Sequence, residues 1–303
     1  MENKKCGIAA IVGRTNTGKS TLLNKVLGRQ AAIVSNVPQT TRNIVRGILN
    51  ESRGQIVFVD TPGIHKPKHR LGKYMNILAE DSARGADVII HLTDSSEAVG
   101  EEERLVVQEI SQFKAPIIIA LNKIDLGGKY VPEYLKLWEE KKRKTISELS
   151  RELTVVPVSA LKGTNIERLL EVLFSFLPQG PLLYPEDMVL DFPERLLYAD
   201  IIREKLFRSM RQEVPHSIAV LVEEIVPRSE KLTYIRAVIF VERPSQRGII
   251  IGEKGKTLKN IGSLARGDLE KQLGKKVYLE LEVKVKENWK EDEALLREMG
   301  ILV

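Results

Sequence analysis

The most specific chemical signal in this 303-residue chain is a glycine-rich loop near its N-terminus. Residues 13–20 read GRTNTGKS and match GxxxxGK[ST], between an apolar run and a helical pattern. Glycines let backbone N–H groups face phosphates, Lys19 reaches the outer phosphates, and the Ser20 hydroxyl ligates Mg²⁺. The predicted phosphate-binding residues are Gly13, Arg14, Thr15, Asn16, Thr17, Gly18, Lys19, Ser20 and Thr21.

A second polar group ends the apolar run at residues 55–60. The Asp60 carboxylate can hold Mg²⁺ through water, and the Gly63 N–H can meet a γ-phosphate. The predicted contacts here are Asp60, Thr61, Pro62, Gly63 and Ile64. Ras-type proteins have a glutamine directly after DxxG, but Ile64 cannot orient a water molecule. We therefore expect hydrolysis to be intrinsically slow or to use another device.

The third group would select the base. Asn122, Lys123 and Asp125 follow the apolar run at residues 116–121. A carboxylate at Asp125 can accept from both guanine N1–H and the exocyclic amine, donors that adenine lacks on that edge. Ser159 and Ala160, after the next apolar run, are placed to offer a backbone N–H to guanine O6. Together these motifs predict a guanine-nucleotide site.

The elements that must position these residues alternate regularly. Short β-branched runs at residues 7–13, 55–60, 87–94, 116–122 and 154–160 are separated by helical patterns such as 101–113 and 166–176. This pattern predicts a doubly wound α/β sheet. Residues 43–49 and 55–60 flank a short turn with no room for a helix, so we expect a hairpin and a mixed sheet.

The second half of the chain has a different pattern. Several prolines in residues 178–194 indicate a linker. Beyond it we expect a helix at 195–211, strands at 217–226 and 233–241, a helix at 257–273 and a strand at 277–286, which make a small α+β domain. The predicted boundaries are 1–180 for the first domain, 181–194 for the linker and 195–303 for the second domain with a C-terminal tail.

Composition sets outer limits on these predictions. The net charge is +6, and residues 243–290 hold 12 basic against 6 acidic groups, which fits a nucleic-acid footprint. No apolar run is long enough for a membrane span and no signal core follows the N-terminus, so we expect a cytosolic chain. Cys6 is expected to be a core residue, and His65 and His69 to be mobile loop residues rather than metal ligands.

The ordered motifs of residues 5–177 resemble the translation-factor class of GTPases. In that class residues 36–42 correspond to the effector loop, which implies that Thr41, with Thr40 as the alternative, binds Mg²⁺ in the GTP state. The resemblance also implies a K⁺ site at Asn16, by analogy with the group that includes the Era family; the alternative is that Asn16 only tolerates unusual dihedral angles. The expected catalytic residues are then Lys19, Asn16, Thr41 and Gly63.

Residues 252–255 read GEKG and match GxxG. The predicted order of elements around this motif, with a helix and two strands before it and a helix and a strand after it, resembles a type II KH domain. Such a domain clamps about four nucleotides of single-stranded RNA. The resemblance implies an RNA-binding set of Ile249, Ile250, Ile251, Gly252, Glu253, Lys254, Gly255, Lys256 and Lys259, with some of the three isoleucines expected to lie in the core.

The whole chain resembles the Era family of bacterial ribosome-assembly GTPases, including YPED at 184–187 and IIREKLFR at 201–208. The family usually has GRPNVGKS, so Thr15 and Thr17 are departures. This resemblance implies a Ras-like P-loop GTPase fold followed by the KH domain, with GTP or GDP, Mg²⁺ and K⁺ as cofactors. It also implies a monomer that binds the 3′ region of 16S rRNA on the 30S subunit and associates peripherally with the inner membrane.

Two other interpretations stay open. The chain could be a constitutive RNA-binding protein with a largely structural guanine-nucleotide site. The chain could also be a relative that acts on tRNA or large-subunit RNA, although the C-terminal GxxG domain argues against this interpretation.

Overall fold

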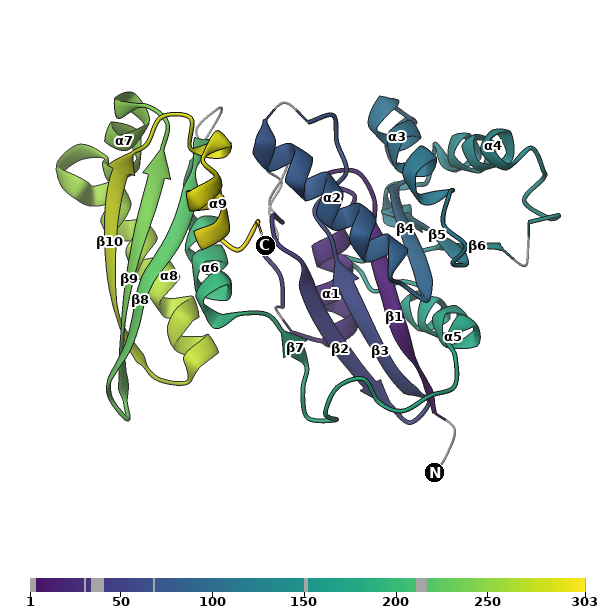
Figure 1. The fold of residues 1–303 in the computed structure, drawn as a ribbon, viewed down its shortest axis with the longest axis horizontal. Coiled ribbons are helices and arrows are strands. Elements are labelled where there is room, and N and C mark those ends of the chain that lie inside the picture. Colours follow the sequence, from purple (N-terminus) through teal and green to yellow (C-terminus); the bar gives the residue numbers. More distant parts are fainter. Residues whose placement is uncertain are drawn as a thin grey trace. The chain divides into compact units, whose positions relative to one another are not determined.

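The computed structural model describes residues 4–29, 31–33, 41–67, 69–149, 152–210 and 217–302. The chain forms two compact units, and the main division between them falls between Asp191 and Phe192. This point lies inside the segment predicted as a linker. Figure 1 shows the elements of both units along the chain.

The first unit is built on a mixed seven-stranded sheet in the order β6-β5-β4-β1-β3-β2-β7. Its strands are β1 (Lys5–Val12), β2 (Val45–Glu51), β3 (Gly54–Asp60), β4 (Val88–Asp94), β5 (Ile117–Asn122), β6 (Leu153–Pro157) and β7 (Leu190–Asp191). The strands β6, β5, β4, β1 and β3 pair in parallel, while β2 pairs antiparallel to β3 and to β7. The predicted hairpin and mixed sheet are therefore confirmed.

Helices follow the strands as the alternation predicts. They are α1 (Lys19–Leu27), α2 (Arg70–Arg84), α3 (Glu101–Ile110), α4 (Val131–Lys142) and α5 (Ile166–Phe176), with a short 3₁₀ turn η1 (Ile124–Leu126). Side chains of α2, α3 and α4 form one apolar core with β1, β4, β5 and β6. This core holds the carboxyl ends of the parallel strands together, and those ends carry the predicted nucleotide motifs.

The segment between the predicted domains is ordered against the first unit. Gln55, fully buried on β3, accepts from the N–H groups of Leu183 and Tyr184 at 2.8 and 2.9 Å. Its amide donates back to the Tyr184 carbonyl at 2.9 Å, and β7 adds an edge strand beside β2. Residues 181–191 are therefore held along the sheet, whereas the composition alone indicated a plain linker.

The second unit is a three-stranded sheet in the order β10-β9-β8 with helices against it. Its elements are α6 (Glu194–Ser209), β8 (Ala219–Ser229), β9 (Leu232–Val241), α7 (Pro244–Ile251), η3 (Glu253–Gly255), α8 (Lys256–Leu273), β10 (Lys276–Val285), η4 (Trp289–Glu291) and α9 (Glu293–Glu298). The strands β8 and β9 are antiparallel, and β9 and β10 are parallel. Helices α6 and α8 contact each other and the sheet.

Two helices of this unit, α7 and α9, were not predicted. The isoleucine run at 249–251 lies in α7, although β-branched residues favour strands. Pro244 begins the helix, and the Gln246 side chain accepts from the N–H groups of Glu242 and Arg243, both at 3.0 Å. This N-terminal capping outweighs the weak intrinsic preference of isoleucine.

None of the helices among the described residues has both the length and the apolar character that a membrane crossing needs.

Candidate nucleotide site and nucleic-acid groove

The predicted phosphate loop joins β1 to α1 and wraps around the side chain of Lys19. Gly18 has φ 98°, a left-handed conformation that glycine adopts without strain. A Cβ atom on Gly13 would lie 2.3 Å from a carbonyl oxygen of β4, so a side chain does not fit there. Lys19 Nζ donates to the carbonyls of Gly13 at 3.2 Å and Arg14 at 2.8 Å. Burial lowers the pKa of this ammonium group to about 8.

The other loop side chains point in different directions. Thr17 is fully buried, and its hydroxyl donates to the Arg14 carbonyl at 3.2 Å. Asn16 is exposed, with φ 62°. Thr21 is half-buried in the first turn of α1. The Arg14 side chain turns to carboxylates behind the loop, so Arg14 presents its backbone, not its guanidinium, to the phosphate cradle.

Three oxygen-bearing side chains from separate segments meet beside the loop. Ser20 Oγ donates to Asp60 Oδ2 at 2.7 Å and lies 2.8 Å from Thr41 Oγ1. Asp60 Oδ1 is buried without a hydrogen-bond partner among the described residues. Burial raises the pKa of the Asp60 carboxyl to about 6. An orphaned carboxylate oxygen beside two hydroxyls fits the hard oxygen ligands that Mg²⁺ takes. Thr40, the alternative ligand, lies outside the described residues.

The segment after β3 crosses the phosphate loop. The Ile64 N–H donates to the first carbonyl of that loop at 3.2 Å, and a Cβ atom on Gly63 would lie 2.9 Å from the Thr15 backbone nitrogen. Thr61 and Pro62 are buried, and the Thr61 hydroxyl donates to a β1 carbonyl at 2.8 Å. The Ile64 side chain is itself in the apolar core. It therefore offers only its backbone to a nucleotide.

His65 was expected to be a mobile loop residue, and the structure does not agree with this expectation. Its side chain is buried, and its Nδ1 lies 2.9 Å from the Gly63 carbonyl oxygen. Asn76 of α2 donates to the His65 carbonyl at 2.8 Å and accepts from its N–H at 3.3 Å. His65 is therefore fixed rather than mobile, because α2 supplies an amide partner that sequence spacing does not reveal. His69 is exposed.

The loop after β5 is tied to the phosphate loop. Asn122 Nδ2 donates to the Thr17 carbonyl at 2.7 Å, and Asn122 Oδ1 accepts from the Ala160 N–H at 2.9 Å. Lys123 has φ 61°, and its ammonium group pairs with Asp94. Burial acts to raise the pKa of the Asp94 carboxyl, but the hydrogen bonds from Lys123 and Ser96 hold it below its usual value.

Asp125 and Ser159 complete the predicted base-reading set. Asp125 lies exposed in η1, while Ser159 is fully buried and its hydroxyl accepts from the Lys162 N–H at 3.1 Å. The Ser159 N–H donates to the Thr164 carbonyl at 3.1 Å. Because the Ala160 N–H is already bonded to Asn122, a guanine O6 would have to share or displace that contact.

In the second unit, the GxxG residues form a tight turn between α7 and α8. Gly252, Lys254 and Gly255 all have positive φ, at 70°, 49° and 76°. A Cβ atom on Gly252 would lie 2.1 Å from Thr257 Oγ1, so only glycine fits there. Lys254 and Lys256 are exposed, as is Glu253. The turn therefore presents charged side chains beside two half-buried glycines at the start of α8.

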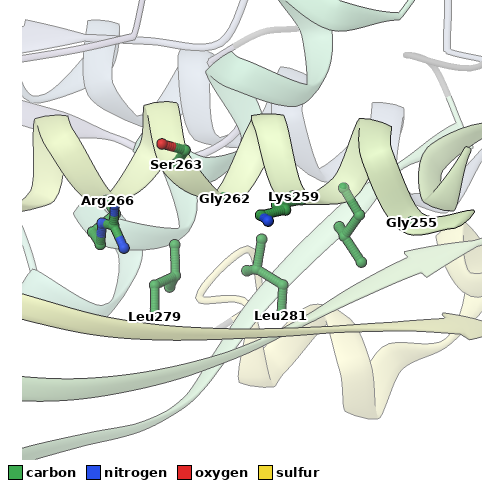
Figure 2. Close-up of a pocket in the computed structure, with 8 residues that line it drawn as sticks. Gly255, Lys259, Gly262, Ser263, Arg266, Leu279 and Leu281 are labelled. Atoms are coloured by element: carbon green, nitrogen blue, oxygen red, sulfur yellow. The ribbon is translucent and has the colours of Figure 1, made fainter.

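A groove of about 410 Å³ runs from this turn between α8 and β10 (Figure 2). One wall is a helical face and the other is the apolar face of a strand. Its lining residues are Gly255, Leu258, Lys259, Gly262, Ser263, Arg266, Leu279 and Leu281. Two cations beside leucines suit a ligand with negative charge and flat apolar faces, which single-stranded nucleic acid has.

The predicted RNA-binding set overlaps this groove in part. Gly255 and Lys259 line it. Ile250 is fully buried in the core of the unit and is removed from the RNA-binding set, as expected for some of the three isoleucines; Ile249 is 52% exposed and Ile251 is half-buried. The other groove residues of α8 and those of β10 were missed. Their signal is the helical spacing at 258, 262 and 266 facing the alternation at 279 and 281.

Comparisons with known proteins identify the family of each unit. A family model described as "50S ribosome-binding GTPase" matches residues 8–123, and one described as "KH domain" matches residues 213–290. The chain is 46% identical to the GTPase Era of Halothermothrix orenii over 297 residues, which cover 98% of each chain. It is also 46% identical to the GTPase Era of Thermotoga petrophila, over 98% of this chain and 97% of that one.

Solved structures give the same result. The chain is similar to Era in complex with MgGDPNP and nucleotides 1506–1542 of 16S ribosomal RNA, with a TM-score of 0.91 and 41% identity over 99% of this chain and 100% of that one. A variant of Aquifex aeolicus Era bound to GDP·AlF4⁻ gives a TM-score of 0.90 with the same identity and coverage. The chain therefore belongs to the Era family of GTPases, with a Ras-like P-loop GTPase domain followed by a KH domain.

Proposed function

We propose that this chain is a GTP-hydrolysing switch that binds the 3′ region of 16S rRNA through its KH groove and assists assembly of the 30S ribosomal subunit. The observation that carries the proposal is the similar Era structure, which holds both MgGDPNP and a 16S rRNA fragment. The groove of this chain supplies cations for phosphates and leucines for bases. The proposed domains are residues 1–180 and 195–303, joined by 181–194.

The Ser20, Thr41 and Asp60 oxygens are the proposed Mg²⁺ set, with Asp60 acting through water. Mg²⁺ bound there would neutralise charge on the β- and γ-phosphates. The Lys19 ammonium group would turn from the loop carbonyls toward those phosphates, and the Gly63 N–H would meet the γ-phosphate. Because Lys19 and Asp60 are buried, their charges act in a medium that screens them weakly.

Guanine selection is proposed to lie at the loops after β5 and β6. The Asp125 carboxylate is exposed in η1, so it is open to a base. Asn122 and Lys123 hold the loop in place through the Thr17 carbonyl and Asp94. Adenine bound over the Asp125 carboxylate would displace its water without offering a donor, which would account for discrimination by orders of magnitude.

We predict that K⁺ stimulates GTP hydrolysis by at least about tenfold over Na⁺, since Ile64 cannot orient water and a cation can replace an arginine finger. The amide oxygen of Asn16 is the proposed ligand. Because Asn16 has φ 62°, Asn16→Gly is the matched variant that keeps the backbone and deletes the amide. Stimulation should vanish in Asn16→Gly; equal rates for wild type in KCl and NaCl would remove Asn16 from the mechanism.

The switch is tested by RNA affinity in two nucleotide states. We expect a 16S rRNA 3′ fragment to bind at least about tenfold more tightly with a nonhydrolysable GTP analogue than with GDP, because allosteric coupling is commonly 1–3 kcal/mol. A shuffled RNA of equal length and composition is the control. Identical affinities in the two states would favour the constitutive RNA-binding protein instead.

The remaining proposals rest on the family resemblance. We propose that the chain works as a monomer in the cytoplasm and associates peripherally with the inner membrane. Sedimentation of the purified protein and flotation with vesicles of anionic lipid test these two points separately.

A further inference from the structure

The side chain of Arg14 lies in a group of carboxylates behind the phosphate loop. Its Nη2 donates to Glu97 Oε2 at 2.6 Å and lies 3.9 Å from Asp94 Oδ2. Its Nε lies 3.3 Å from Glu103 Oε2. Only 14% of the Arg14 side chain is exposed. A residue of the phosphate loop is thus anchored from the side that faces away from the nucleotide.

Glu103 is the buried member of this group. It belongs to α3 and is 0% exposed, against an otherwise apolar helix face. His91 Nε2 lies 2.7 Å from Glu103 Oε1, and the Trp138 indole donates to His91 Nδ1 at 3.1 Å. Since His91 Nδ1 accepts, the ring is neutral with its proton on Nε2. An ordered chain of contacts therefore runs from Trp138 through His91 and Glu103 to Arg14.

The contact between Glu103 and Arg14 is one of charge. Glu103 Oε2 is buried and has no hydrogen-bond partner among the described residues, although the Arg14 guanidinium is within ion-pair distance. A buried carboxylate is costly to keep compared with an apolar side chain of similar size. The position of Glu103 beside Arg14 is therefore better explained by its holding the Arg14 side chain in place than by a gain in the stability of the fold.

Arg14 in turn touches the groups that handle the phosphates. Its carbonyl accepts from Lys19 Nζ at 2.8 Å and from the Thr17 hydroxyl at 3.2 Å. Asp94 is the farthest from Arg14 of the three carboxylates around it, and it also pairs with Lys123 of the base-reading loop. Fixing the Arg14 side chain therefore fixes the carbonyl that orients Lys19.

We propose that Glu103 is a positioning residue for GTP hydrolysis, acting through Arg14 to hold the phosphate loop in its phosphate-binding geometry before the nucleotide arrives. Preorganised charge needs no rearrangement during reaction, and small displacements of such groups reduce rates strongly. The inference rests on the GTPase activity and is independent of the RNA role, so failure of either leaves the other standing.

The test is a double-mutant cycle on the full-length protein, with single-turnover GTP hydrolysis and dissociation of a fluorescent GDP as readouts. Glu103→Gln keeps the shape and an acceptor for His91 but removes the charge. We expect it to reduce the hydrolysis rate about 10- to 100-fold and to accelerate GDP release. In an Arg14→Gln background the same substitution should change neither quantity further.

A merely structural Glu103 gives a different result. Its loss would lower the melting temperature and reduce the rate by the same factor with and without Arg14, which would overturn the proposal. If Glu103→Gln does not fold, Glu103→Asp serves instead, because it keeps the buried charge but draws the carboxylate back from Arg14 by one methylene. A decline of about threefold that disappears without Arg14 supports the proposal; an unchanged rate refutes it.

Discussion

Asp60→Asn is expected to reduce the rate of GTP hydrolysis by at least about 100-fold, and to make the protein more stable at neutral pH when nucleotide and metal are absent. The asparagine keeps the size of the side chain and an acceptor for Ser20, whose hydroxyl now donates to Asp60 Oδ2 at 2.7 Å. It removes the negative charge that completes the oxygen set with Ser20 and Thr41. Loss of this buried charge lowers the activity, because the metal site loses its carboxylate, and raises the stability of the metal-free protein.

The gain in stability follows from the pKa of Asp60. Burial raises it from 3.8 to about 6 in the folded protein. Between these values the folded state binds more protons than the unfolded state, so the free energy of unfolding decreases as pH rises. Above pH ~6 the full penalty is present, on the order of 3 kcal/mol. The stability difference between variant and wild type should therefore be absent near pH ~4 and complete by pH ~7.

Urea unfolding in EDTA at several pH values measures this difference. Asp94→Asn is the matched contrast, because the pKa of Asp94 is lowered by its hydrogen bonds rather than raised. That variant should lose stability at neutral pH, and the loss should shrink as pH falls through the range where Asp94 is protonated. A less stable Asp60→Asn protein at pH ~7 would show that the charge of Asp60 stabilises the metal-free state.

Reversing the charges of the GxxG turn is expected to have the other large effect. Lys254→Asp with Lys256→Asp, keeping both glycines, should weaken binding of a 16S rRNA 3′ fragment by at least about 100-fold. Removing two phosphate contacts should also reduce the salt dependence, by about 1.4 in the slope of log K against log salt concentration. GTP binding at Lys19 and the basal hydrolysis rate should be unchanged.

Two further variants locate the effect. Gly262→Leu adds no charge but fills the groove, since even a Cβ atom at Gly262 would lie 3.4 Å from Leu281. It should abolish binding while leaving the GxxG turn intact. Lys271→Asp is the same type of substitution, with half the change in charge, on α8 outside the groove lining, on a side chain that is 82% exposed. If Lys271→Asp weakened binding as much as the turn variant, general electrostatics rather than the groove would explain the affinity.

The sequence predicted the nucleotide site best where function depends on local backbone. The spacing of Gly13, Gly18 and Lys19 fixes one turn of chain, so no tertiary information is needed to expect a phosphate loop. The positions after β3 and β5 were also predictable, because parallel strands of a doubly wound sheet end at one edge. This is why Ser20 and Asp60, 40 residues apart, were expected to meet and lie within hydrogen-bond distance.

Contacts that depend on tertiary packing could not be predicted in this way. Nothing in the spacing of Arg14 and Glu103 indicates that the guanidinium turns away from the phosphates toward α3. The buried position of His65 depends on Asn76 in the following helix. The isoleucines of α7 were mispredicted for a local reason. Their β-branched run is typical of a strand, but it is helical because of the capping at the N-terminus of α7.

The most direct test of the proposed function is RNA crosslinking in cells, comparing the wild-type chain with the Lys254→Asp, Lys256→Asp variant. The account predicts wild-type crosslinks concentrated at the 3′ end of 16S rRNA, increased when the protein is held in the GTP state and absent in the variant. Crosslinks that avoid small-subunit RNA, or that persist unchanged in the variant, would contradict it.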